Sequence, residues 1–339
     1  MKKFLFIGID FSKSKFDVTL LETIEQTSFV QEWFENDSKG YKTFLKRVSK
    51  QSKIKRETWL FCGEHTGLYS RGLSEFLTKK GLFVWLENPL QIKCSWGIKR
   101  AKNDIIDSIE IARYALRFQD KATAYKPVDK KTDSLRLLFS YRERLVKIKV
   151  ALEVSANEMR RVINRDETAR GIFEDSNREI ERLKNKIETI EKKMHKIIMD
   201  SEMRENYLLM VSIKGVGMLT AVSLLVRTNN FVSFENARQL ACYCGCAPFG
   251  NQSGTVDKGN HISRLANKDL KVLLTLCARS AALHNKELSA YYRRKIAGGK
   301  KDRVVINNIR NKLIQRIFAV VKHKTPYRQN YLDSWEKCA

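Results

Sequence analysis

The chain has 339 residues, roughly twice the ~150 residues of an ordinary domain. Its 43% hydrophobic residues, with only 4 prolines and 16 glycines, exclude a disordered or fibrous protein. Lysine and arginine total 64 against 38 acidic residues, a formal net charge of +26. This excess is larger than solubility requires and predicts a polyanionic partner.

A membrane location and secretion are both disfavoured. The apolar run at residues 4–9 is too short for the core of a signal peptide, and no stretch approaches the ~18 to 20 apolar residues that span a bilayer. Nucleic acid is therefore favoured over lipid as the polyanion. Seven cysteines, an odd number, argue against a disulfide framework. We expect a reduced, cytoplasmic protein.

Five β-prone segments with helices between them are predicted in residues 1–128. The expected strands are 4–9, 16–21, 27–33, 58–62 and 82–86, and the clearest expected helices are 68–79 and 103–116. Strands mixed with helices in this way indicate an α/β domain. Pro127 and the polar run 129–131 mark its end.

Residues 129–202 are expected to form a helical coiled-coil arm. The composition changes to long, charged, proline-free helix, broken once within 164–171. Apolar residues alternate spacings of three and four, which is typical of a coiled-coil seam: Ile180, Leu183, Ile187, Ile190, Met194 and Ile197. A helical hairpin within the chain and a zipper between two copies fit this pattern equally.

Residues 203–339 are expected to form a third, mostly helical domain. Pro248 and the glycines at 245, 250, 254 and 259 predict loop or turn structure over residues 245–263. Cys242, Cys244 and Cys246 lack the C-x2-C pairs and nearby histidines of a closed zinc site. We therefore interpret these cysteines as part of a half-buried apolar segment.

Four carboxylates are candidates for a metal site. Asp10 and Glu64 follow predicted strands, and Asp104 and Asp107 share one face of a helix at i, i+3 spacing. If they converge, divalent cations relieve their repulsion, and Mg²⁺, with Mn²⁺ as a substitute, prefers such oxygen ligands. Two ions ~4 Å apart would support phosphoryl transfer. Singly, each residue is more often an ordinary turn or surface residue, so their joint placement carries the hypothesis.

Two further segments are candidates for chemistry. Residues 213–217 fit a helix-hairpin-helix turn whose backbone N–H groups hold a phosphate through Lys214, Gly215 and Gly217, although such glycines equally allow close helix packing. Ser253 is a candidate nucleophile, but serine is weak without a base or metal, and a Ser-Gly turn is usually only a turn. His65 is a candidate for proton transfer, with a structural role as the alternative.

Basic residues gather near the helix that carries Asp104 and near the C-terminus. The candidate nucleic-acid contacts are Arg100, Lys102, Lys258, Arg264, Arg293 and Arg294. Clusters of this kind neutralise phosphates and make binding salt-dependent. A solvated helix face is the alternative, and the excess over the whole chain favours phosphate. Tyr291 and Tyr292 are candidates to stack on bases, with packing as the alternative.

Five motifs occur in a characteristic order along nearly the whole chain. They are Gly8–Asp10 (GID), Glu64–Tyr69 (EHTGLY), Asn103–Asp107 (NDIID), Ile213–Gly217 (IKGVG), and Ala247-Pro248 followed by Gln252–Gly254 (QSG). This arrangement resembles the insertion-sequence IS110 family of DEDD transposases, with its IS1111 branch and the Piv-type DNA invertases.

The resemblance implies a RuvC-like domain of the ribonuclease H type, a coiled-coil arm and a C-terminal transposase domain. By position, the DEDD quartet is Asp10, Glu64, Asp104 and Asp107, and the serine nucleophile is Ser253. It implies DNA recombination with Mg²⁺ at the carboxylates and a covalent phosphoserine intermediate. The implied partners are donor and target DNA, a structured bridge RNA that pairs with both, and further copies of the chain in a dimer or tetramer.

Two other functions remain open from the sequence. One is a RuvC-like, metal-dependent nuclease that cuts DNA junctions, in which Ser253 is only a turn residue. The other is a non-catalytic scaffold that binds nucleic acid. A covalent protein–DNA adduct that depends on Ser253 distinguishes the recombinase from the nuclease, and loss of recombination in Asp10→Asn distinguishes both enzymes from the scaffold.

Overall fold

The structure is a computed structural model that describes residues 4–23, 30–95, 104–160, 166–253, 256–262 and 265–328. Within these ranges, the side chains of residues 30, 104–106, 251–253 and 256–261 are outside the description. The chain divides into two compact units, residues 1–127 and 128–339. Each unit has its own hydrophobic core, and each is described by itself below.

Unit 1 is built on a five-stranded sheet with the order β3-β2-β1-β4-β5. The strands are β1 (Leu5–Phe11), β2 (Lys15–Leu21), β3 (Val30–Glu35), β4 (Trp59–Glu64) and β5 (Phe83–Glu87). The first three strands form an antiparallel meander, and β4 and β5 run parallel to β1. Parallel neighbours need a crossover, which helices supply here. The predicted α/β domain is therefore confirmed. The third strand was expected at 27–33; it is described over 30–35, and residues 27–29 lie outside the described residues.

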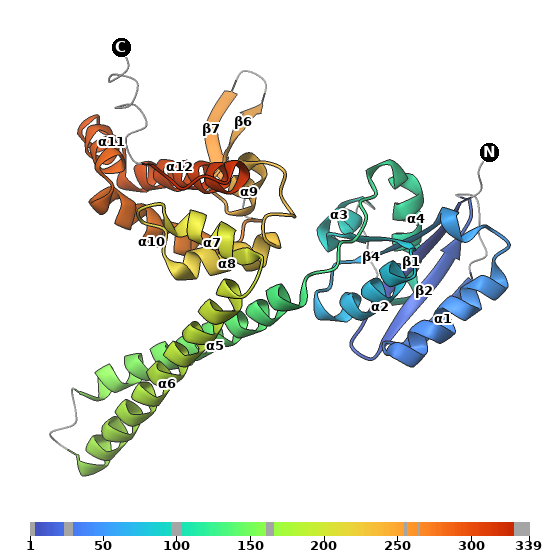
Figure 1. Cartoon of the computed structure of the whole chain (residues 1–339), viewed down its shortest axis with the longest axis horizontal. Coiled ribbons are helices and arrows are strands. Elements are labelled where there is room, and N and C mark those ends of the chain that lie inside the picture. The colour runs from blue at the N-terminus through green and yellow to red at the C-terminus, as the bar shows by residue number, and fades with distance from the viewer. Residues whose placement is uncertain are drawn as a thin grey trace. The chain divides into compact units, whose positions relative to one another are not determined.

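Helices cover both faces of this sheet (Figure 1). They are α1 (Ser38–Gln51), α2 (Leu68–Lys79), α3 (Pro89–Cys94) and α4 (Asp104–Arg117), with 3₁₀ turns at Arg56–Thr58 and Gln119–Lys121. Helices α1 and α2 pack on the face that carries Ile7 and Phe61. Helices α3 and α4 pack on the opposite face, which carries Phe6, Cys62 and Trp85. Both faces of the central strands are thus buried, as is usual for parallel strands.

Unit 2 contains eight helices and one β-hairpin among its described residues. The helices are α5 (Lys130–Met159), α6 (Glu167–Met199), α7 (Met203–Val211), α8 (Met218–Thr228), α9 (Ala237–Tyr243), α10 (Lys268–His284), α11 (Lys286–Ala297) and α12 (Asp302–His323). The strands are β6 (Pro248–Ser253) and β7 (Val256–Ile262). Across the described part of the chain, every helix is too short or too polar to cross a membrane.

Helices α5 and α6 form an antiparallel hairpin (Figure 1). The side chains of Asp129 and Asp166 cap their N-termini by accepting hydrogen bonds from backbone N–H groups. Ile187 and Met194 of α6 are buried against α5, and Arg142 Nε donates to Glu191 Oε1 at 2.7 Å across the pair. The apolar seam of α6 is therefore covered by the preceding helix of the same chain. The hydrophobic core between α5 and α6 continues into the C-terminal helices.

The prediction of loop or turn structure over residues 245–263 was wrong for residues 248–253 and 256–262, which form strands. It holds for residues 245–247, and residues 254, 255 and 263 lie outside the described residues. Strands β6 and β7 pair in antiparallel fashion, with an irregularity between Gly250 and Gln252. Glycine and asparagine have low strand propensity, so these strands carry little local signal. The ladder of backbone hydrogen bonds between the two strands is what stabilises them here.

Candidate functional site

Four neighbouring strands of unit 1 carry acidic residues near one edge of the sheet. Asp10 of β1 pairs with Asp17 of β2, and Glu64 of β4 pairs with Glu87 of β5. The parallel register of β1 and β4, continued by one residue, sets Asp10 beside Glu64. Because neighbouring strands lie ~4.8 Å apart, these four residues form a continuous line. We call Asp17, Asp10, Glu64 and Glu87 the acidic row.

The acidic row lies on the sheet face that α4 covers. Gly8 precedes Asp10 by two residues, and a Cβ atom on Gly8 would lie 2.2 Å from the backbone oxygen of Ser108 in α4. Thr19 Oγ1 and Ser108 Oγ share a buried hydrogen bond of 2.8 Å, and Thr19 follows Asp17 by two residues. Alternate residues of a strand share a face. Asp10 and Asp17 therefore project toward α4.

Helix α4 brings the remaining two predicted carboxylates to this region. The helix begins at Asp104, and half-buried Asp107 immediately precedes Ser108, the residue that touches β1 and β2. Only the backbone of Asp104 is described. The direct contact at Gly8 sets the start of α4 over the two strands that carry Asp10 and Asp17.

Glu87 is held to α4 by Tyr114. The Tyr114 hydroxyl donates to Glu87 Oε2 at 3.2 Å, and the backbone N–H of Asn88 donates to Oε1 at 2.7 Å. Burial, reinforced by the negative charge of Glu87, raises the pKa of Tyr114 to about 12. Burial also raises the pKa of the Cys62 thiol, and the charges of Glu87 and then Glu64 raise it further. Tyr114 is thus a protonated donor at neutral pH.

Asp10 and Glu64 were predicted from the sequence to belong to a carboxylate cluster, whereas Asp17 and Glu87, their neighbours across the strands, were not. In the structure, a connection of three residues between β1 and β2 sets Asp17 opposite Asp10. The predicted strand ends, residues 9 and 16, did not fix this register. Glu87 ends its strand as Glu64 ends the preceding one. Asp17 is paired with Lys15, with 3.0 Å between Nζ and Oδ2. Asp17 therefore belongs to the acidic row even though its carboxylate forms an ion pair with a residue of its own strand.

The acidic row and α4 offer carboxylate oxygens, the ligands that Mg²⁺ prefers. Like charges on directly opposite strand residues repel each other, and a divalent cation would relieve this repulsion. Among the side chains that the structure describes, no three of His, Cys, Asp or Glu gather closely enough to hold a metal ion. Asp104 is not among those side chains. Carboxylate oxygens are suitable ligands for a divalent cation, but the described side chains do not form a complete set of ligands.

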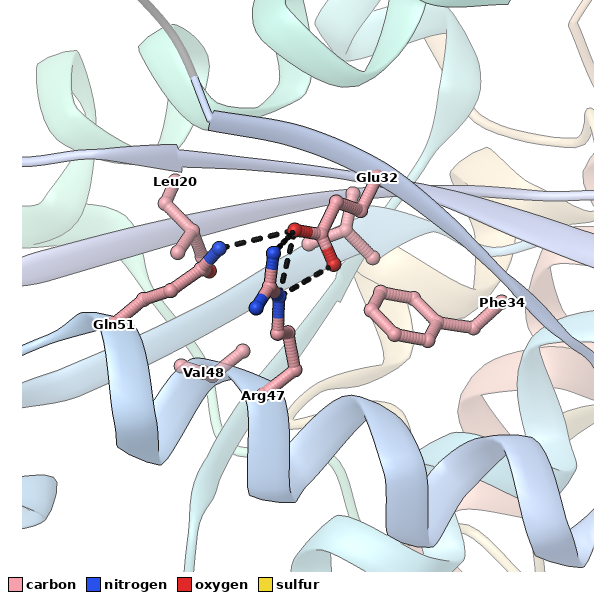
Figure 2. A pocket seen from close by; sticks show the side chains of 7 residues that line it. Leu20, Glu32, Phe34, Arg47, Val48 and Gln51 are labelled. Atoms are coloured by element: carbon pink, nitrogen blue, oxygen red, sulfur yellow. Dashed lines mark hydrogen bonds and ion pairs between the residues drawn. The ribbon is translucent and has the colours of Figure 1, made fainter.

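A small pocket lies on the opposite face of the sheet, between β2, β3 and α1. Figure 2 shows Glu32 accepting hydrogen bonds from Arg47 Nε at 2.7 Å and Gln51 Nε2 at 3.0 Å. The hydrogen bond from Arg47 lowers the pKa of the Glu32 carboxyl, and burial opposes this effect. The pocket has room for about one water molecule. The hydrogen bonds of Glu32 connect β3 to α1. The pocket itself is too small for a substrate.

Ser253 is the last residue of β6 and pairs with Val256 across the hairpin. It therefore lies next to the connection between the two strands. The side chains of Ser253 and of Lys258 in β7 are outside the description. Three other candidate contacts lie entirely outside the described residues: Arg100, Lys102 and Arg264.

The turn at residues 213–217 connects α7 to α8 and packs against α10. Gly215 has a φ of +101°, and a Cβ atom there would lie 2.8 Å from the Cβ of Ala281. The Cys277 thiol of α10 shares a buried hydrogen bond of 3.1 Å with Thr220 Oγ1, in the first turn of α8. Gly215 thus serves the packing of the turn against α10, whereas a Cβ atom on Gly217 would meet open space. Lys214 is the exposed candidate of this turn for a phosphate contact.

Arg293 and Arg294 are exposed on α11. The Arg294 guanidinium lies 5.9 Å from the centre of the Tyr291 ring, within cation–π range. The Tyr292 hydroxyl donates to Asp302 Oδ1 at 2.9 Å. Both half-buried tyrosines are therefore engaged within the protein, while the two arginines face solvent and remain candidates for phosphate contacts.

Two family models match separate parts of the chain. A model of DEDD transposases of the IS110 type, described as "Transposase", matches residues 7–165. A second model, described as "Transposase IS116/IS110/IS902 family", matches residues 207–293. Together they match more than half of the chain, including Asp10, Glu64, Asp104, Asp107 and Ser253.

Three curated proteins are similar to the chain. The pilin gene-inverting proteins of Moraxella bovis and Moraxella lacunata are each 26% identical over 332 residues, 95% of this chain and 97% of each relative. An uncharacterized 43.6 kDa protein of insertion element IS110 from Streptomyces coelicolor is 34% identical over 118 residues, 35% of this chain and 29% of that protein.

Proposed function

Because this chain belongs to the IS110 family of transposases, whose activity is DNA recombination, we propose that it cleaves and rejoins DNA through Asp10, Glu64, Asp104, Asp107 and Ser253. The observation that carries this proposal is the acidic row on the α4 face of the sheet, with Asp10 beside Glu64. We assign unit 1 to the RuvC-like, ribonuclease H type domain of this site.

The DEDD carboxylates would hold Mg²⁺, and Mn²⁺ is a substitute with the same preference for oxygen ligands. When bound, two such ions supply activation of an attacking oxygen and stabilisation of a leaving oxygen in phosphoryl transfer. The contact of Gly8 with Ser108 and the Thr19–Ser108 hydrogen bond hold α4 on the sheet. This packing positions Asp107 relative to Asp10 before the substrate binds, which lowers the cost of organising the site.

Ser253 supplies the nucleophile. Its Oγ atom bonds to the phosphorus of a DNA phosphodiester and gives its proton to a carboxylate or water, while the bond from phosphorus to one deoxyribose oxygen breaks. That oxygen leaves as a hydroxyl after taking up a proton. Attack by a deoxyribose hydroxyl on the serine phosphoester reverses these steps and rejoins DNA. Because one phosphoester replaces another, the cycle needs no ATP.

The proposed site draws on both units, and a homo-oligomer, dimer or tetramer allows the carboxylates and Ser253 to come from different copies. We include a structured bridge RNA among the partners. The net charge of +26 supports extensive phosphate binding. Base pairing between that RNA and donor and target DNA would provide the sequence specificity that a generally basic surface lacks.

The test is a recombination assay with the purified full chain, RNA transcribed from the flanking DNA, Mg²⁺ and labelled donor and target DNA. The wild type is expected to give recombined product and a covalent protein–DNA adduct. Ser253→Ala should lose both, because the attacking hydroxyl is gone. Asp10→Asn should also lose both, because one carboxylate ligand is gone. Omitting the RNA should abolish product formation.

The control is Ser233→Ala, which changes an exposed serine of unit 2 outside the proposed site and should recombine like the wild type. Metal-dependent nicking without an adduct in the wild type, retained by Ser253→Ala, would show a junction nuclease instead. Full recombination by Asp10→Asn and by Glu64→Gln would remove the carboxylates from the mechanism.

A further inference from the structure

Helix α12 carries a buried arginine whose side chain has no hydrogen-bond or ion-pair partner among the residues that the structure describes. Arg310 is only 9% exposed, and its Nε atom is buried with no hydrogen-bond partner. Within the described part of the chain, Arg310 forms no ion pair with a carboxylate. Burying a charge without a partner is strongly destabilising. The packing of unit 2 therefore does not by itself account for an arginine at this position.

Two asparagines lie close to Arg310 in the sequence of α12, and each has a side-chain oxygen that accepts no hydrogen bond from the described residues. The Oδ1 atoms of Asn307 and Asn311 are also buried without partners. Asn307 Nδ2 donates to the backbone oxygen of Cys246 at 3.0 Å, which fixes that amide against the segment that leads into β6. The amide of Asn311 can rotate by half a turn to present its N–H₂ group instead of its oxygen.

Lys271 of α10 brings a second cation to the same place. Its Cδ atom lies 3.7 Å from the position of a Cβ atom on Gly245. The charges of Arg310 and then Lys271 lower the pKa of the Cys246 thiol, although burial has the larger effect and raises it. The two cations therefore flank Cys246, two residues before β6 begins at Pro248.

The guanidinium of Arg310 remains accessible at its outer end. Of its three nitrogens, only Nε is buried and unpartnered, and Nη1 and Nη2 form no hydrogen bond with the residues that the structure describes. Arginine presents its N–H groups in a planar fork that fits phosphate oxygens, and lysine and asparagine are also common phosphate contacts in protein–DNA complexes.

We propose that Arg310, Asn311 and Lys271 form a phosphate-binding site at the base of the β6–β7 hairpin, and that its ligand is a backbone phosphate of DNA. This proposal rests on the proposed function, because the same hairpin carries Ser253. Ser253 lies five residues along β6 from Pro248 at the base of the hairpin, a span of roughly 17 Å. A phosphate held at the base anchors the DNA about five base-pair steps from the phosphate that Ser253 attacks.

The central variant is Arg310→Met in the full chain, which removes the charge and keeps most of the side-chain volume. Because Arg310 has no ion-pair partner among the described residues, the melting temperature should stay equal or rise. The affinity for a fluorescein-labelled DNA duplex of random sequence should fall. The slope of log Kd against log salt concentration should become shallower by about one, since one phosphate contact is lost. Fluorescence anisotropy over a series of salt concentrations measures both quantities.

A second variant tests the proposal at a less buried position, where a substitution is less disruptive to folding. Lys271 is only half-buried, and Lys271→Gln should reduce the slope by a similar amount. Arg310→Lys retains a cation and should keep most of the slope. The matched control is Arg182→Gln on α6, where an exposed arginine is already paired with Glu179, and it should bind DNA like the wild type.

An unchanged salt slope in both Arg310→Met and Lys271→Gln, with DNA binding and recombination by the wild type intact, would overturn this proposal and leave the proposed function standing. A lower melting temperature of Arg310→Met with unchanged slope would show that the arginine is structural. Weaker binding of an RNA hairpin with unchanged binding of duplex DNA would assign the phosphate to RNA. No DNA binding by the wild type would overturn both proposals.

Discussion

Tyr114 shows how one side chain ties the acidic row to the helix above it. Its hydroxyl is a donor to Glu87, which in turn accepts from the backbone of Asn88. Burial and the charge of Glu87 both favour the neutral phenol, which is why its pKa is raised to about 12. A hydrogen bond to a charged group contributes about 1.5 to 3 kcal/mol. This bond therefore secures the last strand of the row against α4.

The pH dependence of stability should reveal this bond. The raised pKa means that the contribution of Tyr114 is complete below the ordinary tyrosine value of about 10. It is lost as pH rises through the folded-state value of about 12. Tyr114→Phe should unfold at lower urea concentration than the wild type at neutral pH, and this difference should shrink above about pH 10. Tyr69→Phe, at an exposed tyrosine, is the control. Parallel pH curves for wild type and Tyr114→Phe would refute the assignment.

The α5–α6 hairpin illustrates how a pair of long, highly charged helices is stabilised. The exposed sides carry ion pairs within α6, such as Lys192 with Glu188, and exposed pairs of this kind contribute little. The buried side carries Met194 and Ile198, both fully buried, in a core shared with the C-terminal helices. Apolar burial on this side, rather than surface charge, should therefore dominate the stability of the hairpin.

Substitution of adjacent residues on α6 separates these two contributions. Met194→Ala should lower the free energy of unfolding by about 2 to 4 kcal/mol, because it leaves a cavity in the core. Lys193→Ala, at an exposed position of the same helix, should change it by less than about 0.5 kcal/mol. Urea unfolding followed by circular dichroism measures both values. Equal effects of the two substitutions would contradict a core role for this face of α6.

At the scale of the whole molecule, the chain consists of two units with separate cores. The clusters around the five-stranded sheet draw only on residues before Pro127. The large helical cluster begins with Leu135 and runs to Val321. The proposed carboxylates lie in the first unit and Ser253 in the second. The proposed metal ligands and the proposed nucleophile therefore belong to units with separate hydrophobic cores.

The two units should fold independently. Fragments 1–127 and 128–339 are each expected to unfold cooperatively and to keep their share of the secondary structure of the full chain, because no hydrophobic cluster of described residues spans the boundary. Circular dichroism and thermal unfolding of the separate fragments test this expectation. Failure of either fragment to fold, together with rescue on mixing, would show that the units depend on each other.

Much of the secondary structure and part of the site were predictable from the sequence. The apolar run at the start of the chain predicts β1, and an acidic residue at the end of a buried strand marks Asp10 and Glu64. The three-and-four spacing of Ile187, Ile190 and Met194 predicts a helix with one buried face. These features are periodic along the chain, so they are readable without knowing what each element packs against.

Strands β6 and β7, the membership of Asp17 and Glu87 in the acidic row, and the isolation of Arg310 were not predicted. The strength of a glycine-rich hairpin lies in pairing between its strands and leaves little trace in residue types. Membership of the row depends on register across four strands and on which face α4 covers. By itself, the sequence determined the kinds of elements, the positive charge and the motifs of the family. Only the tertiary structure decided which side chains share a face and which buried charge lacks a partner, because both depend on contacts between residues far apart along the chain.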